Sequence, residues 1–107
     1  TTPYGRDTKV AGHPLKVCEL LSQTGGAAYI SRNAVDTVKH IKETKAAIKK
    51  AFEYQLAGKG FSLVEVLSTC PTNWGLSPME SLEWLRENMM PFYPLGVYKD
   101  LGEDKNE

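Results

Sequence analysis

Helical spacing is clearest between Ala34 and Leu56, where apolar residues recur every three or four positions. The helix that this spacing predicts collects the following apolar residues on one face: Val38, Ile41, Ile48, Phe52 and Leu56. Asn33 and Thr37 are both suitable N-caps, so the pattern allows one helix, or a short helix followed by a longer one. Gly58-Lys59-Gly60 ends this region, because glycine readily adopts the left-handed conformation found after helices.

The strongest strand signal is Phe61–Leu67, which is rich in β-branched residues and apolar almost throughout. A shorter strand is predicted at Ala27–Ser31, on the other side of the helix. Strand, helix and strand in this order form a βαβ unit, which implies parallel strands joined by a right-handed crossover. The pattern therefore predicts an α/β fold.

Two predicted strands are few for such a sheet. Parallel sheets are normally covered on both faces and contain more strands than this. Phe61–Leu67 has the character of a central strand, yet the chain offers it one clear partner. We therefore expect further strands from sequence upstream of Thr1 or from another chain. An unpaired sheet edge could also join two copies of this chain as a homodimer.

Shorter helices are predicted on both sides of the βαβ unit. The first begins near Pro14 and ends at Thr24-Gly25-Gly26, with an apolar stripe formed by Leu15, Cys18 and Leu21. The second begins at Ser77-Pro78-Met79-Glu80, which is a full capping box with proline at the first helical position, and ends before Pro91.

The remaining segments lack helical or strand periodicity. Thr1–Gly12 is interpreted as an extended segment or loop, and Ser68–Leu76 as a loop after the strongest strand. Pro91–Gly96 is interpreted as an extended apolar arm, of a kind that packs on another surface. Residues 101–107 are glycine, lysine and acidic residues for the most part, so we expect a disordered tail.

Composition narrows the class of protein. The chain has 107 residues, of which 41% are hydrophobic, enough for a packed core but for no more than one domain. Thirteen basic residues balance 13 acidic ones, so the chain lacks the excess positive charge typical of nucleic-acid binding. No apolar run is long enough to span a membrane, and two cysteines cannot form a disulfide scaffold. We therefore expect a cytoplasmic protein.

Cys70 is the candidate site residue, because it comes just after the strongest strand. In open α/β sheets, ligands bind outside the carboxyl ends of the strands. A thiol there could be a nucleophile, a metal ligand, or a half-buried side chain that only fills space. A metal site formed by this chain alone is poorly supported, because zinc and iron–sulfur sites need about four ligands.

The other candidate residues have structural interpretations. Cys18 lies on the apolar stripe of the first helix, which indicates packing in the core. His13 precedes a proline in a loop, and His40 falls among lysines on a solvated face, so neither is a convincing catalytic base. The lysines between Lys39 and Lys50 indicate a solvated helix surface, with docking to an acidic partner as the alternative.

The run Gly60–Gly75, which contains Glu-Val-Leu-Ser-Thr-Cys-Pro-Thr, resembles a segment of a known family. It is similar to the C-terminal part of the thiamine-diphosphate-binding β subunit of 2-oxoacid:ferredoxin oxidoreductases, in the 2-oxoglutarate and 2-oxoisovalerate branch. Weaker matches at Thr2–Asp7, Ala28–Arg32 and Lys45–Ile48 extend the resemblance over nearly the whole chain.

The resemblance implies a fold, a reaction and a role for Cys70. Members of the family have the thiamine-diphosphate-binding α/β fold, decarboxylate a 2-oxoacid on the thiazolium carbon, pass electrons through an iron–sulfur cluster to ferredoxin, and release an acyl-coenzyme A. In members with a four-iron, four-sulfur cluster in this subunit, a cysteine placed as Cys70 is here supplies the fourth ligand. The resemblance therefore implies that Cys70 is a cluster ligand.

This sequence lacks other parts of the family's pattern. The three further cluster cysteines and the Gly-Asp-Gly segment that holds magnesium and the diphosphate are absent. Because Thr1 is not a start residue and the first methionine is Met79, we expect both to lie upstream. We expect residues 1–107 to be the C-terminal part of a single thiamine-diphosphate-binding domain, inactive and without bound cofactor by itself. Its partners would be the other subunits, with ferredoxin and coenzyme A serving the full enzyme.

A second interpretation is a complete small flavodoxin-like binding or interaction module without catalysis. It agrees with the βαβ pattern but leaves the missing strands unexplained.

Overall fold

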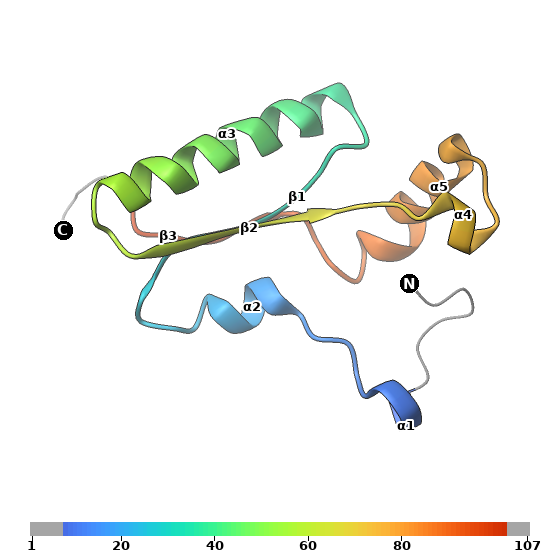
Figure 1. The fold of residues 1–107 in the computed structure, drawn as a ribbon, viewed down its shortest axis with the longest axis horizontal. Coiled ribbons are helices and arrows are strands. Elements are labelled where there is room, and N and C mark those ends of the chain that lie inside the picture. The colour runs from blue at the N-terminus through green and yellow to red at the C-terminus, as the bar shows by residue number, and fades with distance from the viewer. Residues whose placement is uncertain (1–7, 103–107) are drawn as a thin grey trace.

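The computed structural model describes residues 8–102, which form a mixed three-stranded sheet with helices on both faces (Figure 1). β1 (Ala27–Ala34) lies between β2 (Phe61–Leu67) and β3 (Gly96–Asp100). β1 and β2 are parallel, with Ala27 paired to Phe61 and Ala34 to Leu67, whereas β3 is antiparallel to β1. The predicted α/β class and parallel βαβ unit are therefore confirmed.

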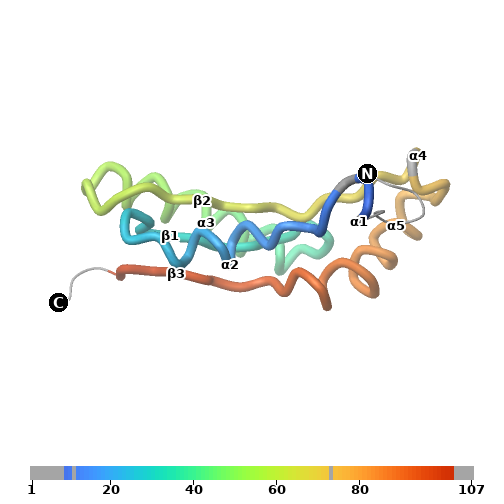
Figure 2. The backbone as a smooth tube through the Cα atoms, turned by 90° about the horizontal axis from the view of Figure 1, so that it is seen from below, coloured from blue at the N-terminus to red at the C-terminus, as the bar shows by residue number. Residues whose placement is uncertain are grey.

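The central strand is β1, and the expectation that Phe61–Leu67 would be central is wrong for the described residues. All of β1 except Asn33 is buried, whereas most of β2 is half-buried or exposed. β3 is the second neighbour of β1. The segment Pro91–Gly96, which was predicted as an extended arm, ends at the first residue of this strand. Figure 2 shows the three strands side by side, with β2 and β3 at the two edges.

α3 (Val38–Leu56) covers one face of the sheet (Figure 1). It begins at Thr37, one of the two predicted caps, whose hydroxyl accepts a hydrogen bond of 3.1 Å from the His40 amide. The helix faces the strands with Thr44, Ala47 and Tyr54, which are its buried residues. Small side chains at this contact allow the helix axis to approach the sheet closely.

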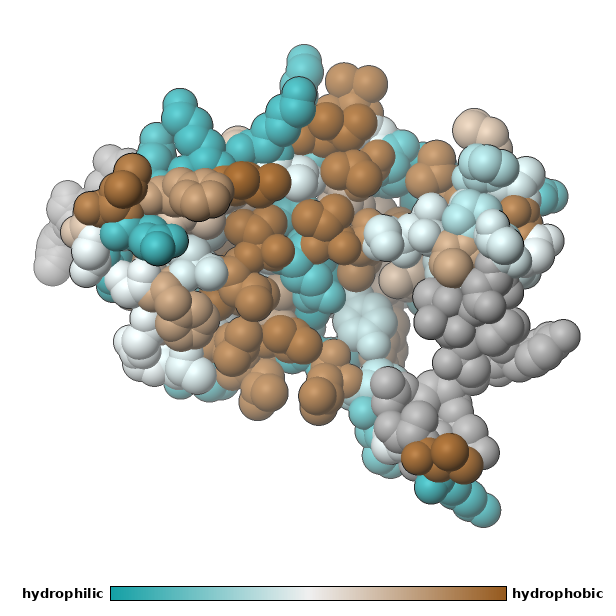
Figure 3. Space-filling model, in the orientation of Figure 1, coloured by the Kyte–Doolittle hydropathy of each residue, from teal (hydrophilic) through white to brown (hydrophobic). Residues whose placement is uncertain are grey.

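The predicted apolar face of α3 is mostly exposed rather than packed. Val38 is 69% exposed, Phe52 63% and Leu56 88%. Ile48 and Phe52 line a shallow groove of about 190 Å³ together with Ser62 and Val64 of β2, so the stripe lies on the β2 side of the sheet. In Figure 3, apolar side chains gather on this side, over α3 and the sheet.

α2 (Val17–Leu21) lies on the opposite face of the sheet and buries Cys18 against Ala27 and Ile30 (Figures 1 and 2). This helix is shorter than predicted, and the chain between Gly12 and Lys16 is not helical. α1 (Thr8–Ala11) is a single turn in the region predicted as a loop. The expected conformation of residues 1–7 lies outside the described residues.

The predicted helix in the C-terminal third begins and ends at the residues that the sequence indicates. α5 (Pro78–Trp84) carries the complete capping box and continues into a π-helical turn, η1 (Leu85–Met89), which ends before Pro91. α4 (Pro71–Trp74) is a short helix inside the predicted loop.

After β3, the described chain continues to residue 102. Leu101 donates a backbone hydrogen bond of 3.0 Å to the carbonyl of Ala28. Most of the segment 101–107 predicted as a disordered tail is not described, so that expectation stays a prediction. Residues 103–107 lie outside the described part. Among the described residues, no helix is both long and apolar enough to cross a membrane.

Candidate functional site

Cys70 lies where the sequence places it, directly beyond the carboxyl end of β2. It is half-buried and occupies the N-cap position of α4, followed by Pro71 at the first helical position. The Cys70 carbonyl accepts a hydrogen bond of 2.9 Å from the amide of Trp74. Gly75 closes this turn with a φ of +71°, a conformation that residues with a side chain rarely adopt. The thiol is thus carried on a short, hydrogen-bonded turn.

The turn that holds Cys70 is fixed by contacts with the following helix. The rings of Trp74 and Trp84 are 4.5 Å apart between centroids, which joins α4 to α5. Beneath α5 and η1, Leu82 and Leu85 line a small cavity of about 120 Å³ with Leu67 and Thr69 at the end of β2. The ring contact therefore holds the turn that carries Cys70 against α5, and the cavity borders the loop that leads to it.

A buried arginine lies on the face of the sheet that α2 covers. The side chain of Arg32 in β1 is 0% exposed. It forms a two-point ion pair with Glu19 of α2, at 2.7 and 3.1 Å, and its Nε donates to Glu65 of β2 at 3.0 Å. Because a buried charge is costly unless it is paired, these two carboxylates are what allow Arg32 to lie there.

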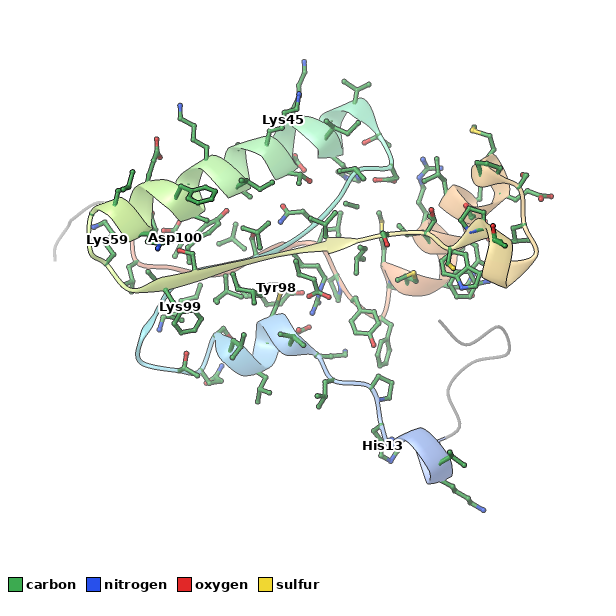
Figure 4. All side chains as sticks on the ribbon, viewed as in Figure 1. His13, Lys45, Lys59, Tyr98, Lys99 and Asp100 are labelled. Atoms are coloured by element: carbon green, nitrogen blue, oxygen red, sulfur yellow. The ribbon has the colours of Figure 1, made fainter. Side chains whose placement is uncertain are left out.

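Aromatic and thiol groups complete the environment of Arg32. The rings of Tyr93 and Tyr98 lie 5.2 and 5.1 Å from the guanidinium carbon, and the Tyr98 hydroxyl accepts a hydrogen bond of 3.0 Å. Figure 4 shows Tyr98 on the α2 side of the sheet. The Cys18 thiol donates to Glu65 at 3.1 Å. We call Glu19, Arg32, Glu65, Tyr98 and Cys18 the Arg32 cluster.

The titration of the Arg32 cluster follows from these contacts. Burial opposes the charge of Arg32, but hydrogen bonds with Glu19 and Glu65 hold its pKa above the ordinary value. The hydrogen bond from Arg32 lowers the pKa of Glu19. Burial, reinforced by the Glu65 carboxylate, raises the pKa of the Cys18 thiol to about 12. Cys18 is therefore protonated and inert at neutral pH, in agreement with its predicted packing role.

Sequence reasoning did not identify the Arg32 cluster, although a signal was present. Arg32 and Glu65 are charged residues within otherwise uncharged strands, and they are direct partners in the parallel register. Opposite charges at matching positions of two predicted neighbouring strands point to a buried ion pair. The contributions of Glu19 and Tyr98 come from distant segments and needed the structure.

The comparisons with known proteins agree on one group of enzymes. The ketoisovalerate oxidoreductase subunit VorA of Methanothermobacter thermautotrophicus is 40% identical over 100 residues, which are 94% of this chain and 21% of that subunit. The 2-oxoglutarate synthase subunit KorB of Methanocaldococcus jannaschii is 30% identical over 115 residues, covering 98% of this chain and 38% of that subunit. This chain is homologous to part of these 2-oxoacid oxidoreductase subunits. The resemblance inferred from the sequence is therefore confirmed.

The comparisons also show how much of each relative this chain covers. KorB of Archaeoglobus fulgidus is 32% identical over 93 residues, covering 82% of this chain and 32% of that subunit. The chain thus spans between about a fifth and two fifths of the length of the curated relatives that it matches. No family model matches the chain. No solved structure matches it either.

The described residues were predicted to offer one cluster ligand, Cys70, and their metal-ligating side chains are dispersed. Within residues 8–102, no group of three or more His, Cys, Asp or Glu side chains could hold a metal ion. Cys70 would therefore need ligands from outside this segment to hold an iron–sulfur cluster.

His40 is the sequence candidate that the structure places differently. We expected it on a solvated face, but its side chain is only 25% exposed and its Nδ1 lies 2.5 Å from Oδ1 of Asp36. The Asp36 carboxylate is 1% exposed and also accepts a hydrogen bond of 2.7 Å from Arg86. Burial disfavours the charge of Asp36, but the hydrogen bonds from His40 and Arg86 lower its pKa. His40 is therefore an oriented imidazole rather than a freely solvated one.

The remaining candidates lie as predicted. His13 is exposed in the segment between α1 and α2 (Figure 4). Most of the lysines of α3 are exposed, and Figure 4 shows Lys45 pointing away from the sheet. Lys50 is half-buried and reaches Asp100 of β3 at 3.3 Å.

Proposed function

We propose that this chain is part of an oxidoreductase that oxidatively decarboxylates a 2-oxoacid to an acyl-coenzyme A and passes the electrons to ferredoxin. The observation that carries the proposal is the 40% identity with a ketoisovalerate oxidoreductase subunit over 94% of the chain. The parallel βαβ unit, with a cysteine at the carboxyl end of β2, is compatible with it. A cytoplasmic location and association with further subunits, ferredoxin and coenzyme A belong to the same proposal.

The proposal assigns Cys70 as one ligand of a four-iron, four-sulfur cluster. Support comes from its half-buried position on the α4 turn, which the Trp74–Trp84 ring contact joins to α5. The other ligands, and the groups that hold thiamine diphosphate and magnesium, would come from other segments or chains. Electron transfer and thiazolium chemistry would be supplied by those cofactors in the assembled enzyme, and residues 1–107 alone are expected to be inactive.

The exposed side of β2 supports the view that this chain completes a larger sheet. Ile48 and Phe52 of α3 are exposed beside β2, which has one neighbouring strand among the described residues. The hydroxyl of Ser62 in β2 is buried and has no hydrogen-bond partner within residues 8–102. A further strand beside β2 would cover these apolar side chains and offer polar backbone groups. The alternative, a self-sufficient flavodoxin-like module, leaves this edge unexplained.

Activity assays test the proposal. The purified 107-residue chain, given thiamine diphosphate, magnesium, coenzyme A and either 2-oxoisovalerate or 2-oxoglutarate, should not reduce a viologen dye. The complex isolated through a tag on this polypeptide should do so. Turnover by the chain alone would contradict the expected inactivity, and a complex without 2-oxoacid-dependent reduction would contradict the proposed function.

The Cys70 assignment is tested in that complex by iron content and by electron paramagnetic resonance. Cys70→Ser should lower the iron bound and remove or alter one cluster signal. Cys18→Ser is the matched control, because serine can still donate to Glu65 and Cys18 is held inside the core. Equal iron content and spectra in the two variants would show that Cys70 is not a ligand.

A further inference from the structure

An ion pair between Asp36 and Arg86 joins the carboxyl end of β1 to the helical segment that follows Cys70. Asp36 lies in the turn between β1 and α3, and Arg86 lies in η1. Arg86 Nε donates to Oδ2 of Asp36 at 2.7 Å, and its second nitrogen, Nη2, donates to the Asp36 backbone carbonyl at 3.1 Å. Because two donors of one planar guanidinium meet two acceptors of one residue, the contact fixes orientation as well as distance.

The Asp36 carboxylate is held in place for this contact. Its side chain is 1% exposed, and the His40 ring in the first turn of α3 contacts Oδ1, which leaves Oδ2 for Arg86. A buried carboxylate is costly without partners, so rotation away from Arg86 is unfavourable. The side chain of Arg86 is 41% exposed, so it can be replaced without opening the core.

The ion pair is connected to the Cys70 turn through α5 and α4. η1 continues α5, whose last residue is Trp84, and the ring of Trp84 contacts that of Trp74 in α4. The Trp74 amide donates to the Cys70 carbonyl at 2.9 Å. Figure 1 shows α4 and α5 together beyond the end of β2. A continuous series of contacts therefore links Arg86 to Cys70.

η1 departs from regular α-helical geometry where it carries Arg86. The Met90 amide donates to the Leu85 carbonyl, five residues earlier, at 3.0 Å, which is the hydrogen bond of a π-helical turn. Such turns are rare and frequently occur at functional sites. In this turn Leu85 is buried and its neighbour Arg86 reaches Asp36, so the irregular turn faces the carboxyl end of β1.

We propose that Asp36 and Arg86 are positioning residues, which hold the Cys70 turn in one place relative to the carboxyl ends of β1 and β2. Groups around a metal ligand commonly orient it, and the fixed turn would give the Cys70 thiol one direction. The consequence for an iron–sulfur cluster rests on the proposed function, whereas the placement of the turn does not.

The rate at which iodoacetamide alkylates each cysteine of the 107-residue chain tests this placement. Arg86→Gln removes the charge and the paired donors, so the turn should open more often. Cys70 should then react about threefold faster, which corresponds to losing one partly exposed ion pair. Cys18 is the internal control, because it is 0% exposed and reacts only when the core opens. An unchanged rate at Cys70, or an equal increase at both cysteines, would overturn the proposal.

Further variants show whether the two residues act as a pair. Glu87→Gln is the matched control, because Glu87 is exposed on the same π-helical turn, and it should leave both rates unchanged. Asp36→Asn should accelerate Cys70 as Arg86→Gln does, and the double variant should react no faster, because both changes break one contact. Multiplying effects, or an equal acceleration in Glu87→Gln, would contradict the proposal. If Asp36→Asn does not fold, the ratio of the two cysteines in Arg86→Gln decides alone.

Electron paramagnetic resonance of the tagged complex tests the consequence for the cluster. Arg86→Gln should keep the iron that Cys70→Ser loses, but it should shift or broaden the signal that depends on Cys70. An unchanged signal would show that the ion pair does not position the ligand. If iron binding does not depend on Cys70, the proposed cluster role fails, while faster alkylation of Cys70 would still support the placement of the turn by Asp36 and Arg86.

Discussion

The guanidinium of Arg32 joins α2, β2 and β3 to the central strand. Its partners Glu19, Glu65 and Tyr98 come from these three elements, so one buried charge fixes their relative positions. Apolar residues at these positions could pack as well, but they would not select one arrangement by hydrogen-bond geometry. We therefore infer that the Arg32 cluster makes the placement of α2 and β3 specific.

Replacing Arg32 tests how much of the stability depends on the cluster. Arg32→Met removes the charge and keeps much of the volume, but it leaves Glu19 and Glu65 without a cation. We expect a loss of about 3 kcal/mol in the free energy of unfolding, the low end for breaking a buried pair, because both carboxylates are about one-third exposed. Urea unfolding measures the loss.

The control for this change is Lys49→Met, which removes a positive charge from an exposed position of α3. Its effect should stay within about 0.5 kcal/mol. If Arg32→Met and Lys49→Met had the same unfolding midpoint, the Arg32 cluster would not contribute to stability.

Acid should destabilise the chain through the same residues. The pKa of Glu19 is lowered by its hydrogen bond with Arg32, and that of Asp100 is lowered, against the effect of burial, by Tyr54 and Lys50. A carboxyl group with a depressed pKa in the folded state contributes stability above its ordinary pKa and loses it as the pH falls through the folded value. The free energy of unfolding should therefore fall below pH 4.5, the ordinary value for glutamate.

Urea unfolding at a series of pH values checks this expectation. Glu19→Gln should flatten the acid-dependent part of the profile, because the group that must be protonated has been removed. Glu83→Gln, which removes an exposed carboxylate from α5, should leave the profile unchanged. A Glu19→Gln profile as steep as that of the unmodified chain would refute the assignment.

At the scale of elements, the sequence predicted several helix and strand boundaries correctly, but it did not predict which face of α3 is buried. Thr37 and the capping box at Ser77 mark the observed helix starts, and Phe61–Leu67 is a strand with the predicted bounds. Such signals are local, because a cap bonds to amides within the next turn. The buried face of α3, in contrast, was not the apolar stripe.

The capping box offers a test of one element. Ser77 Oγ accepts from the Glu80 amide at 3.2 Å, and the Glu80 side chain accepts from the Ser77 amide at 2.9 Å. Ser77→Ala should destabilise α5 by about 1 kcal/mol, seen as faster amide hydrogen exchange in its first turn. Ser77→Asp keeps an acceptor and should exchange nearly as slowly as the unmodified chain. Identical exchange in the alanine variant would mean that the box is not needed.

At the scale of the whole molecule, the described residues form a sheet with one poorly covered side. β2 is an edge strand, and the groove between α3 and β2 is lined by Ile48, Phe52 and Val64. Exposed edges beside apolar surface favour association with other strands. The purified chain should therefore self-associate through the β2 edge, which pairs with β1 alone among the described residues.

Sedimentation over a range of concentrations tests this expectation. The double substitution Ile48→Lys and Phe52→Lys should shift the chain to monomer, because lysines in the groove beside β2 repel each other and resist burial. Val10→Lys changes an exposed apolar residue in α1, away from the groove, and should leave association unchanged. A chain that is monomeric at every concentration would contradict the prediction.

The sequence by itself determined the α/β class, the parallel βαβ unit, the start of α5 and the place of Cys70 after β2, and it offered Thr37 as one of two caps for α3. These depend on residues close together in the chain: caps, glycines, and the periods of helix and strand. The family resemblance rested on the contiguous run Gly60–Gly75, which can be recognised without knowledge of any contact.

Only the tertiary structure decided which strand is central, which face of α3 is buried, and which charges meet inside the protein. β1 is central because β3 returns from the end of the chain to pair with it, and α3 turns Thr44 and Ala47 toward the strands because small side chains permit close packing. The Arg32 cluster and the ion pair of Asp36 with Arg86 join segments distant in sequence. Their formation depends on the chain path in space, which local pattern does not encode.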